Sequence, residues 1–349
     1  MIHIGRNSKK YQKSLREQAH DRLVSMQAFG ESKSEARDNA SDRDKIFSFD
    51  TYKAYWKHVK YFVGWMKQEH PDITTLKSAK RYVGEWLKTR IDQVDEKGQK
   101  LSAWTIHLEA AALYKLFQIE KGDLERIALP KRERRNIKRS RVEVDRDKHF
   151  SKTNNDQLIR FCRGTGCRKN VLVRLEGRDL WTRSQMEAEV KKLENMPSIN
   201  NKETKHLRTL KDALVAFPDQ DAFVHHRKDK NGLYRYAPII GPDKDAIIER
   251  FKETAPTQKV WLHVPAHADI HGYRAAYALR VYKLHARDIK TIPYDKVNRG
   301  TGCRYQGDVY FCRREEKGLA LDRRSLRITS KALGHSRECV VAENYIRGL

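Results

Sequence analysis

The chain has 349 residues, a length that fits two domains, or three. Lys and Arg number 72 against 46 Asp and Glu, which leaves a formal net charge of +26 at pH 7. Hydrophobic residues make up 39%, enough for a packed core, and six Trp, fifteen Tyr and eleven Phe argue against a disordered polycation. The sequence has no apolar run of the length of a membrane span and no secretory signal, so neither secretion nor membrane insertion is expected. The charge excess calls for an acidic partner, of which nucleic acid is the commonest.

Residues 1–41 are polar and basic, and they are expected to form an N-terminal segment or arm. Within them, Leu15, Ala19, Leu23 and Met26 have the spacing of one short helix. The stretch 31–41 has the composition of a linker.

Residues 42–128 have the periodicity of a small all-α domain. Apolar side chains recur every three or four residues along 52–66, and His70-Pro71 predicts the end of that helix because proline has no backbone N–H. A second amphipathic helix is predicted over 79–91, and a third begins after Ser102, a favourable N-cap residue. The aromatic residues of these helices fit a core better than a base-stacking surface.

A basic linker is predicted over 129–150. Seven of the eleven residues from 131 to 141 are basic, and a run this dense repels itself unless a partner neutralises it. A solvated linker would explain the composition equally simply, but contact with a phosphate backbone is at least as well supported. The expected DNA-binding residues are Lys131, Arg132, Arg134, Arg135, Lys138, Arg139 and Arg141.

Residues 151–349 have the mixed pattern of an α+β domain. Helices are predicted over 155–162, 182–195, 203–216, 243–253 and 272–287, and from 331 to the C-terminus. A strand is predicted over 171–175, and a β-hairpin over 223–240 around an Asn231-Gly232 turn. The stretch 288–330 is expected to be irregular, apart from a short strand at 309–311.

The five cysteines are expected to be reduced thiols. Their number is odd, and their spacings lack the C-x-x-C pattern of common zinc sites. A zinc site would need Cys162 and Cys167 to meet Cys303 and Cys312, which is not expected. No carboxylate cluster indicates a two-metal nuclease.

Several basic and hydroxyl side chains follow one another in a distinctive order in the second half of the chain. Arg168 ends Thr165-Gly-Cys-Arg168, and Lys230 falls in the predicted hairpin. His271-Gly-Tyr-Arg274 places a titratable ring and a fixed positive charge one helical turn apart. His335 ends Leu333-Gly-His335, and Tyr345 follows ten residues later. Each motif alone is weak evidence for a catalytic site, and it is their order along the chain that is distinctive.

This order resembles the catalytic domain of the tyrosine recombinases, the integrase family of phages and mobile elements. The helical domain and basic linker resemble that family's core-DNA-binding domain and connector, so the resemblance covers about residues 42–349. It implies a multidomain protein in which a small all-α core-DNA-binding domain precedes an α+β catalytic domain. It also implies a site-specific recombinase that acts as a homo-tetramer on double-stranded DNA with specific recombination sites. Accessory DNA-bending or directionality factors, no cofactor, no metal and a cytoplasmic, nucleoid-associated location in a prokaryotic host are implied as well.

The resemblance also assigns the catalytic roles. Tyr345 would be the nucleophile that forms a 3′-phosphotyrosine, and Arg168 and Arg274 would stabilise the charge of the transition state. Lys230 would protonate the leaving oxygen, although Lys228 competes for that role. His271 would accept the tyrosine proton or hold the phosphate, and His335 would donate to a non-bridging oxygen.

The chain departs from the family pattern in several places. Val171 stands where an acidic residue is common, and 182–219 and 288–330 are expected to be insertions. Tyr345 follows His335 by one residue more than expected, and the chain ends soon after it. A type IB topoisomerase-like enzyme and a catalytically inactive DNA-binding regulator remain the alternatives.

Overall fold

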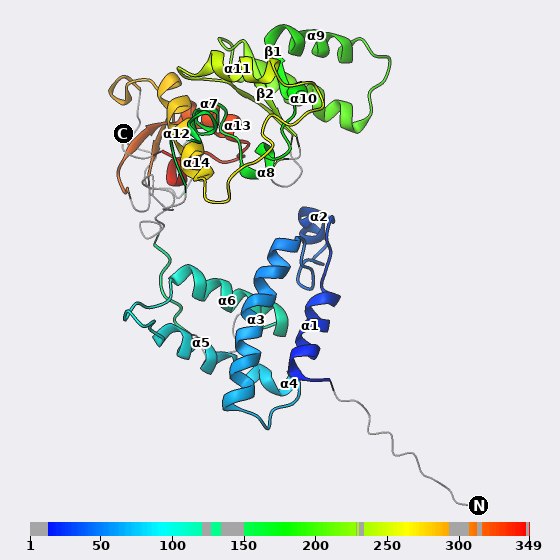
Figure 1. Cartoon of the computed structure of the whole chain (residues 1–349), viewed down its shortest axis with the longest axis vertical. Coiled ribbons are helices and arrows are strands. Elements are labelled where there is room, and N and C mark those ends of the chain that lie inside the picture. The colour runs from blue at the N-terminus through cyan, green and yellow to red at the C-terminus, as the bar shows by residue number, and fades with distance from the viewer. Residues whose placement is uncertain are drawn as a thin grey trace, which may run out of the picture. The chain divides into compact units, whose positions relative to one another are not determined.

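The computed structural model describes residues 13–120, 127–133, 150–227, 229, 234–292, 307–312, 316–346 and 349. The chain divides into two compact units, residues 1–133 and 134–349 (Figure 1). Within the described ranges, no helix is both long and apolar enough to cross a bilayer.

The first unit is entirely helical apart from isolated bridges in the residues described. Its helices are α1 (Leu15–Ser25), α2 (Lys33–Asp38), α3 (Phe49–Glu69), α4 (Leu76–Ala79), α5 (Val83–Asp92) and α6 (Ala103–Phe117). The predicted cap is confirmed, because the Ser102 side chain accepts a hydrogen bond from the Thr105 backbone N–H at the start of α6. Ser48 caps α3 in the same way.

The core of this unit begins earlier in the chain than expected. Ala19 and Leu23 of α1 are fully buried and belong to the same hydrophobic cluster as Phe62 of α3 and Leu113 of α6. The helix predicted near residues 15–26 is thus confirmed, but it belongs to the helical unit. The hydrophobic cluster therefore includes residues that precede the boundary expected at residue 42, because the apolar face of α1 needs the other helices to cover it.

The second unit is α+β, as predicted. Its main sheet is antiparallel, with the order β1-β2-β3, and a two-stranded sheet pairs β4 with β5. The strands are β1 (Leu180–Thr182), β2 (Ala222–His226), β3 (Arg235–Pro238), β4 (Val309–Phe311) and β5 (Ala320–Asp322). The helices are α7 (Asp156–Thr165), α8 (Lys169–Leu172), α9 (Arg183–Glu194), α10 (Asn201–Ala216), α11 (Lys244–Lys252), α12 (Ile270–His285), α13 (Arg323–Leu333) and α14 (Glu338–Asn344).

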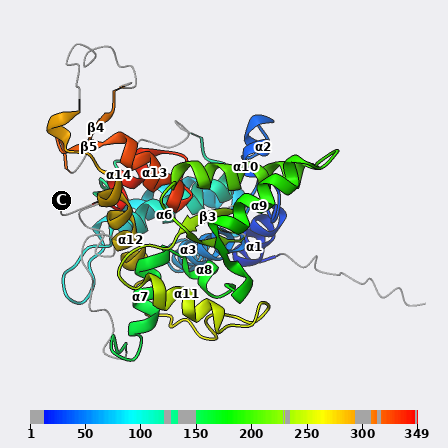
Figure 2. The same cartoon turned by 90° about the horizontal axis from the view of Figure 1, so that it is seen from above.

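The hairpin predicted over 223–240 is confirmed in its strands. His226 pairs with Arg235, and Val224 pairs with Ala237, whereas the predicted turn lies outside the described residues. The predicted helices over 182–195 and 203–216 are also confirmed as α9 and α10, which lie side by side (Figure 2).

Two local predictions are wrong. Residues 171–175 are not a strand, since Val171 and Leu172 are buried in the short helix α8. Residues 288–330 are not irregular throughout, because α13 begins at Arg323. Asp322 caps that helix by accepting hydrogen bonds from two backbone N–H groups of its first turn. Leu326 and Leu333 are buried on its apolar face, and the basic side chains of its other face disguise this periodicity in the sequence.

Candidate active site

Five of the six predicted catalytic residues lie in the described part of the second unit, on segments far apart in the sequence. Arg168 immediately precedes α8, and His271 and Arg274 lie in the first turns of α12. His335 follows the end of α13, and Tyr345 follows the end of α14. Lys230 and its competitor Lys228 lie outside the described residues.

Tyr345 is the residue around which three of the others gather. Its ring centroid lies 5.5 Å from that of His271 and 5.5 Å from that of His335. The guanidinium carbon of Arg274 lies 5.7 Å from the centre of the same ring. Tyr345 is only 6% exposed. Two imidazoles and one guanidinium therefore surround a single phenol.

Arg274 is almost completely buried and joins the motifs to one another. Its Nη1 donates a hydrogen bond to the carbonyl oxygen of Gly166, and its Nη2 donates to that of Leu333. Burial lowers the pKa of Arg274, while the neighbouring Tyr345 oxygen acts in the opposite direction. One side chain thus connects the turn before Arg168 with the segment that leads into His335.

The two motif glycines are required by these close approaches. Gly166 has φ +60°, and a Cβ there would lie 2.3 Å from the ring of Tyr277. Gly334 has φ +67°, and a Cβ there would lie 2.7 Å from Cδ of Arg235. Glycine adopts positive φ without a side-chain clash, so both residues fit where other side chains would not.

Arg168 is partly accessible and has a carboxylate partner. Its side chain is 22% exposed, and its Nη1 lies 2.5 Å from Oδ2 of Asp229, a residue that is 5% exposed. Asp229 also lies 3.2 Å from Arg235, both at Nε and at Nη2. One buried carboxylate thus serves two arginines.

Arg235 and His226, which sequence reasoning did not assign to the site, complete this buried network. Arg235 donates from Nη2 to His226 Nδ1 at 2.7 Å and from Nη1 to the carbonyl oxygen of Ala332, near the end of α13. Because Nδ1 accepts, His226 is neutral. Burial, followed by the charges of Arg235, Arg274 and Arg168, lowers its pKa well below the usual value. The sequence signal available for these two residues was their place on the two strands of the predicted β-hairpin, and the structure pairs them directly.

Arg235 remains charged at neutral pH despite its burial. Burial, followed by the charge of the nearby Arg274, lowers its pKa to about 10, and Asp229 acts in the opposite direction. Arg235 and Arg274 together provide donors for two carbonyl groups in the last turn of α13, which have no partners within the helix.

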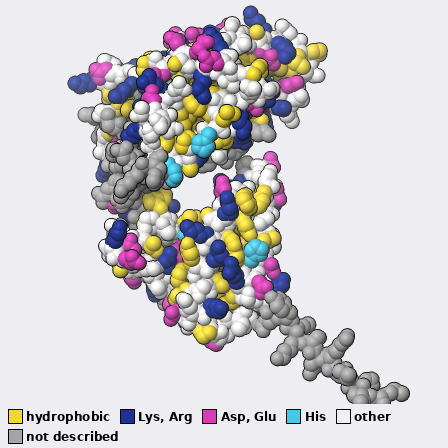
Figure 3. Space-filling model, viewed as in Figure 1, with side chains coloured by type: hydrophobic (Ala, Val, Ile, Leu, Met, Phe, Trp, Pro, Cys, Tyr) yellow, Lys and Arg dark blue, Asp and Glu magenta, His cyan; other side chains and the backbone are white. Residues whose placement is uncertain are grey.

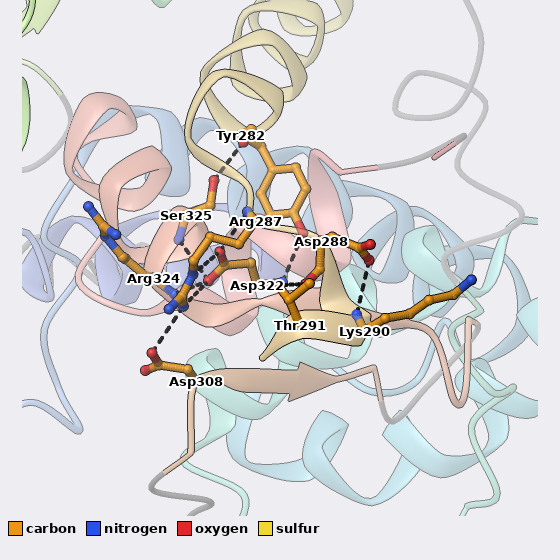
Figure 4. A network of polar contacts seen from close by, with 9 residues as sticks. All are labelled: Tyr282, Arg287, Asp288, Lys290, Thr291, Asp308, Asp322, Arg324 and Ser325. Carbon is orange, nitrogen blue, oxygen red and sulfur yellow. Dashed lines mark hydrogen bonds and ion pairs between the residues drawn. The ribbon is translucent and has the colours of Figure 1, made fainter. Parts of the chain in front are cut away.

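A polar network at the other end of α13 fixes the position of that helix (Figure 4). Arg287, just after α12, donates to both carboxylate oxygens of Asp322 at 2.9 Å and to Asp308 at 3.0 Å. The Ser325 hydroxyl donates to the carbonyl oxygen of Tyr282 at 2.6 Å, and the Tyr282 hydroxyl accepts from the Asp322 backbone N–H. Helices α12 and α13, which deliver Arg274 and His335, are therefore joined at both ends.

Only the first two basic residues of the predicted linker lie within the described residues. The Arg132 guanidinium lies 5.2 Å from the ring centre of Trp104 in α6, and Lys131 precedes it. His107 of α6 makes a 3.0 Å hydrogen bond to the carbonyl oxygen of Pro130. The start of the linker thus packs on the helical unit. The other predicted contacts, Arg134, Arg135, Lys138, Arg139 and Arg141, lie outside the described residues.

The visible face of the helical unit in Figure 3 has Lys and Arg side chains gathered across its middle, beside hydrophobic ones. Such a surface suits a polyanionic partner. Among the residues that the structure describes, no three His, Cys, Asp or Glu side chains are placed to hold a metal ion.

No family model matches this chain, and no curated protein matches it significantly.

Proposed function

We propose that this protein is a site-specific DNA recombinase or integrase that cuts and rejoins double-stranded DNA through a 3′-phosphotyrosine intermediate. The observation that supports this most directly is the grouping of His271, Arg274 and His335 around the buried Tyr345. Together with Tyr345, these residues come from three separate sequence motifs, whereas a core tyrosine needs only one hydrogen-bond partner for its hydroxyl. Integration or excision of a mobile element or prophage is the biological role that fits this chemistry, with double-stranded DNA as substrate and a homo-tetramer as the active assembly.

The proposed reaction needs no external energy source. The Tyr345 oxygen attacks the scissile phosphorus, the bond to the 5′-oxygen breaks, and the energy of the phosphodiester is kept in the phosphotyrosine. A 5′-hydroxyl from a second strand then attacks that phosphorus and releases Tyr345, which rejoins the DNA.

Each neighbouring group has a role in this scheme. Arg168 and Arg274 supply positive charge for the non-bridging oxygens, where negative charge increases in the transition state. His271 accepts the phenol proton, and His335 donates a hydrogen bond to a non-bridging oxygen. Protonation of the leaving 5′-oxygen is assigned to Lys230 by prediction alone.

The experiment that tests this proposal is covalent trapping. Purified full-length protein is mixed with nicked DNA duplexes that carry the ends of the element encoding it, and the products are separated on a denaturing gel. A slowly migrating protein–DNA species is expected with the wild type and should be absent with Tyr345→Phe, which should still bind the DNA.

Tyr277→Phe is the matched control, because Tyr277 is another buried tyrosine of this unit and its hydroxyl donates to the Pro238 carbonyl. It should retain the covalent species. Trapping by Tyr345→Phe would show that the nucleophile is another residue. Relaxation of supercoils without dependence on sequence would favour a type IB topoisomerase-like enzyme, and binding without cleavage on the true ends would favour an inactive regulator.

A further inference from the structure

The carboxylate that contacts Arg168 comes from a part of the chain that sequence reasoning did not connect with it. Arg168 precedes α8, where the nearby Val171 and Leu172 are both buried and apolar. No acidic residue follows Arg168 within that helix. Asp229, between the strands of the β2–β3 hairpin, supplies the carboxylate 2.5 Å from Nη1 of Arg168.

Asp229 is held in place by Arg235, a side chain in which each of the three guanidinium nitrogens has a partner. Arg235 contacts Asp229 from Nε at 3.2 Å, His226 from Nη2 at 2.7 Å, and the Ala332 carbonyl from Nη1. Asp229 and Arg235 are 5% and 6% exposed, respectively. Arg235 therefore has a structural role, and its contacts fix the position of the Asp229 carboxylate.

Arg168 differs from Arg235 in the donors that it retains. Only Nη1 is engaged, whereas Nε and Nη2 have no hydrogen-bond partner among the described residues, and the side chain is 22% exposed. A guanidinium donates in its plane, so a carboxylate fixed on Nη1 sets the direction of the remaining Nε–Nη2 edge. That edge has the two parallel donors that a phosphate binds.

We propose that Asp229 is a positioning residue for Arg168, which turns the free edge of that guanidinium toward the scissile phosphate. This inference rests on the proposed function. Asp229 does not itself touch the reacting atoms. Its effect is transmitted through the orientation of Arg168, and a misplacement of about 1 Å is enough to lower the rate by roughly 100-fold.

The test compares single-turnover formation of the covalent complex for wild type and Asp229→Asn. The asparagine keeps the size of the side chain but loses the charge that holds Arg168. Covalent complex formation should slow by about 10- to 100-fold, while DNA affinity changes by less than about threefold.

A second substrate separates positioning from general damage to the fold. Replacing one non-bridging oxygen of the scissile phosphate by a methyl group makes that phosphate neutral, so the charge of Arg168 is no longer needed there. On this methylphosphonate DNA, Asp229→Asn and Arg168→Ala should both react within about threefold of the wild type. A merely structural defect would persist on both substrates and would overturn the inference.

Asp179→Asn is the matched control, because it removes the charge of another buried carboxylate, one that lies 2.7 Å from Nε of Arg227 in the same unit. It should react like the wild type on both DNAs. If Asp229→Asn does not fold, Asp229→Glu replaces it, because this variant keeps the charge and displaces the carboxylate. It should slow covalent complex formation less than Asp229→Asn does, and it should likewise react at nearly the wild-type rate on the methylphosphonate DNA.

The outcomes for Asp229 and for the proposed function are distinguishable. Absence of a covalent complex with the wild-type protein would count against the recombinase itself. A wild type that reacts while Asp229→Asn reacts equally fast, or faster, would overturn only the role of Asp229. A faster variant would mean that the carboxylate competes with the phosphate for Arg168.

Discussion

Nη2 of Arg274 donates a hydrogen bond to the carbonyl oxygen of Leu333, which joins the helix that carries His271 to the segment that carries His335. The same guanidinium reaches the Gly166 carbonyl through Nη1. Arg274 is 1% exposed, so it is as much a part of the core as of the candidate site. Three motifs that look independent in the sequence therefore share one structural support.

Replacing Arg274 should destabilise the protein far more than replacing Arg168. Arg274→Ala leaves two buried carbonyl groups without donors and should lower the free energy of unfolding by about 3 kcal/mol or more. Arg168→Ala should cost about 1 kcal/mol, because Arg168 is partly exposed and Asp229 keeps its contact with Arg235. Urea denaturation of the two variants checks this difference, and equal losses would contradict the role of Arg274 as a structural connection.

Gly166→Ala should be strongly destabilising because of crowding. The new Cβ would lie 2.3 Å from the Tyr277 ring in addition to the strain of φ +60°. Gly318→Ala is the control, since Gly318 has φ +95° but nothing within 4 Å of the added atom. The control should cost about 1–2 kcal/mol and Gly166→Ala at least about 2 kcal/mol more. Thermal denaturation measures both, and similar melting temperatures would rule out the predicted steric overlap.

The second unit should lose stability at low pH because the Asp322 carboxylate becomes protonated. Burial raises the pKa of this carboxyl, but the hydrogen bonds from Arg287 and Ser325 outweigh burial and lower it to about 2. A pKa depressed in the folded state adds stability above the unfolded pKa of about 4, and that stability is lost as the pH falls toward 2. Asp322→Asn should therefore cost about 1–2 kcal/mol at pH 6, with the difference from wild type shrinking between pH 4 and pH 2. A difference that stays constant with pH would contradict this assignment.

Binding to DNA should depend steeply on salt. If about eight phosphates are contacted, the logarithm of the association constant should fall with a slope near −7 against the logarithm of the salt concentration. Fluorescence anisotropy with labelled duplex between 50 and 300 mM NaCl, roughly the range where counterion release dominates, measures this slope. Arg132→Gln should make the slope shallower by about one if that residue contacts a phosphate. A slope near zero would mean that the charge of +26 serves another partner.

Much of the fold follows from local patterns in the sequence. The amphipathic period of residues 52–66, the Ser102 cap and the two strands of the β2–β3 hairpin were predictable because neighbouring residues determine them. The short helix α8 was not, because β-branched residues favour a strand and only packing of Val171 and Leu172 into the core reverses that preference. The start of α13 was hidden by the basic residues on its exposed face.

The sequence alone determined which residues are candidates for the site, because the order of Arg168, His271, Arg274, His335 and Tyr345 is a property of the chain. Only the tertiary structure decided how they are arranged. It placed two imidazoles and a guanidinium around Tyr345, made Arg274 a connection between motifs, and brought Asp229 to Arg168 from a hairpin about 60 residues away. A buried carboxylate such as Asp229 needs a charged partner, and which arginine lies beside it depends on how distant segments pack.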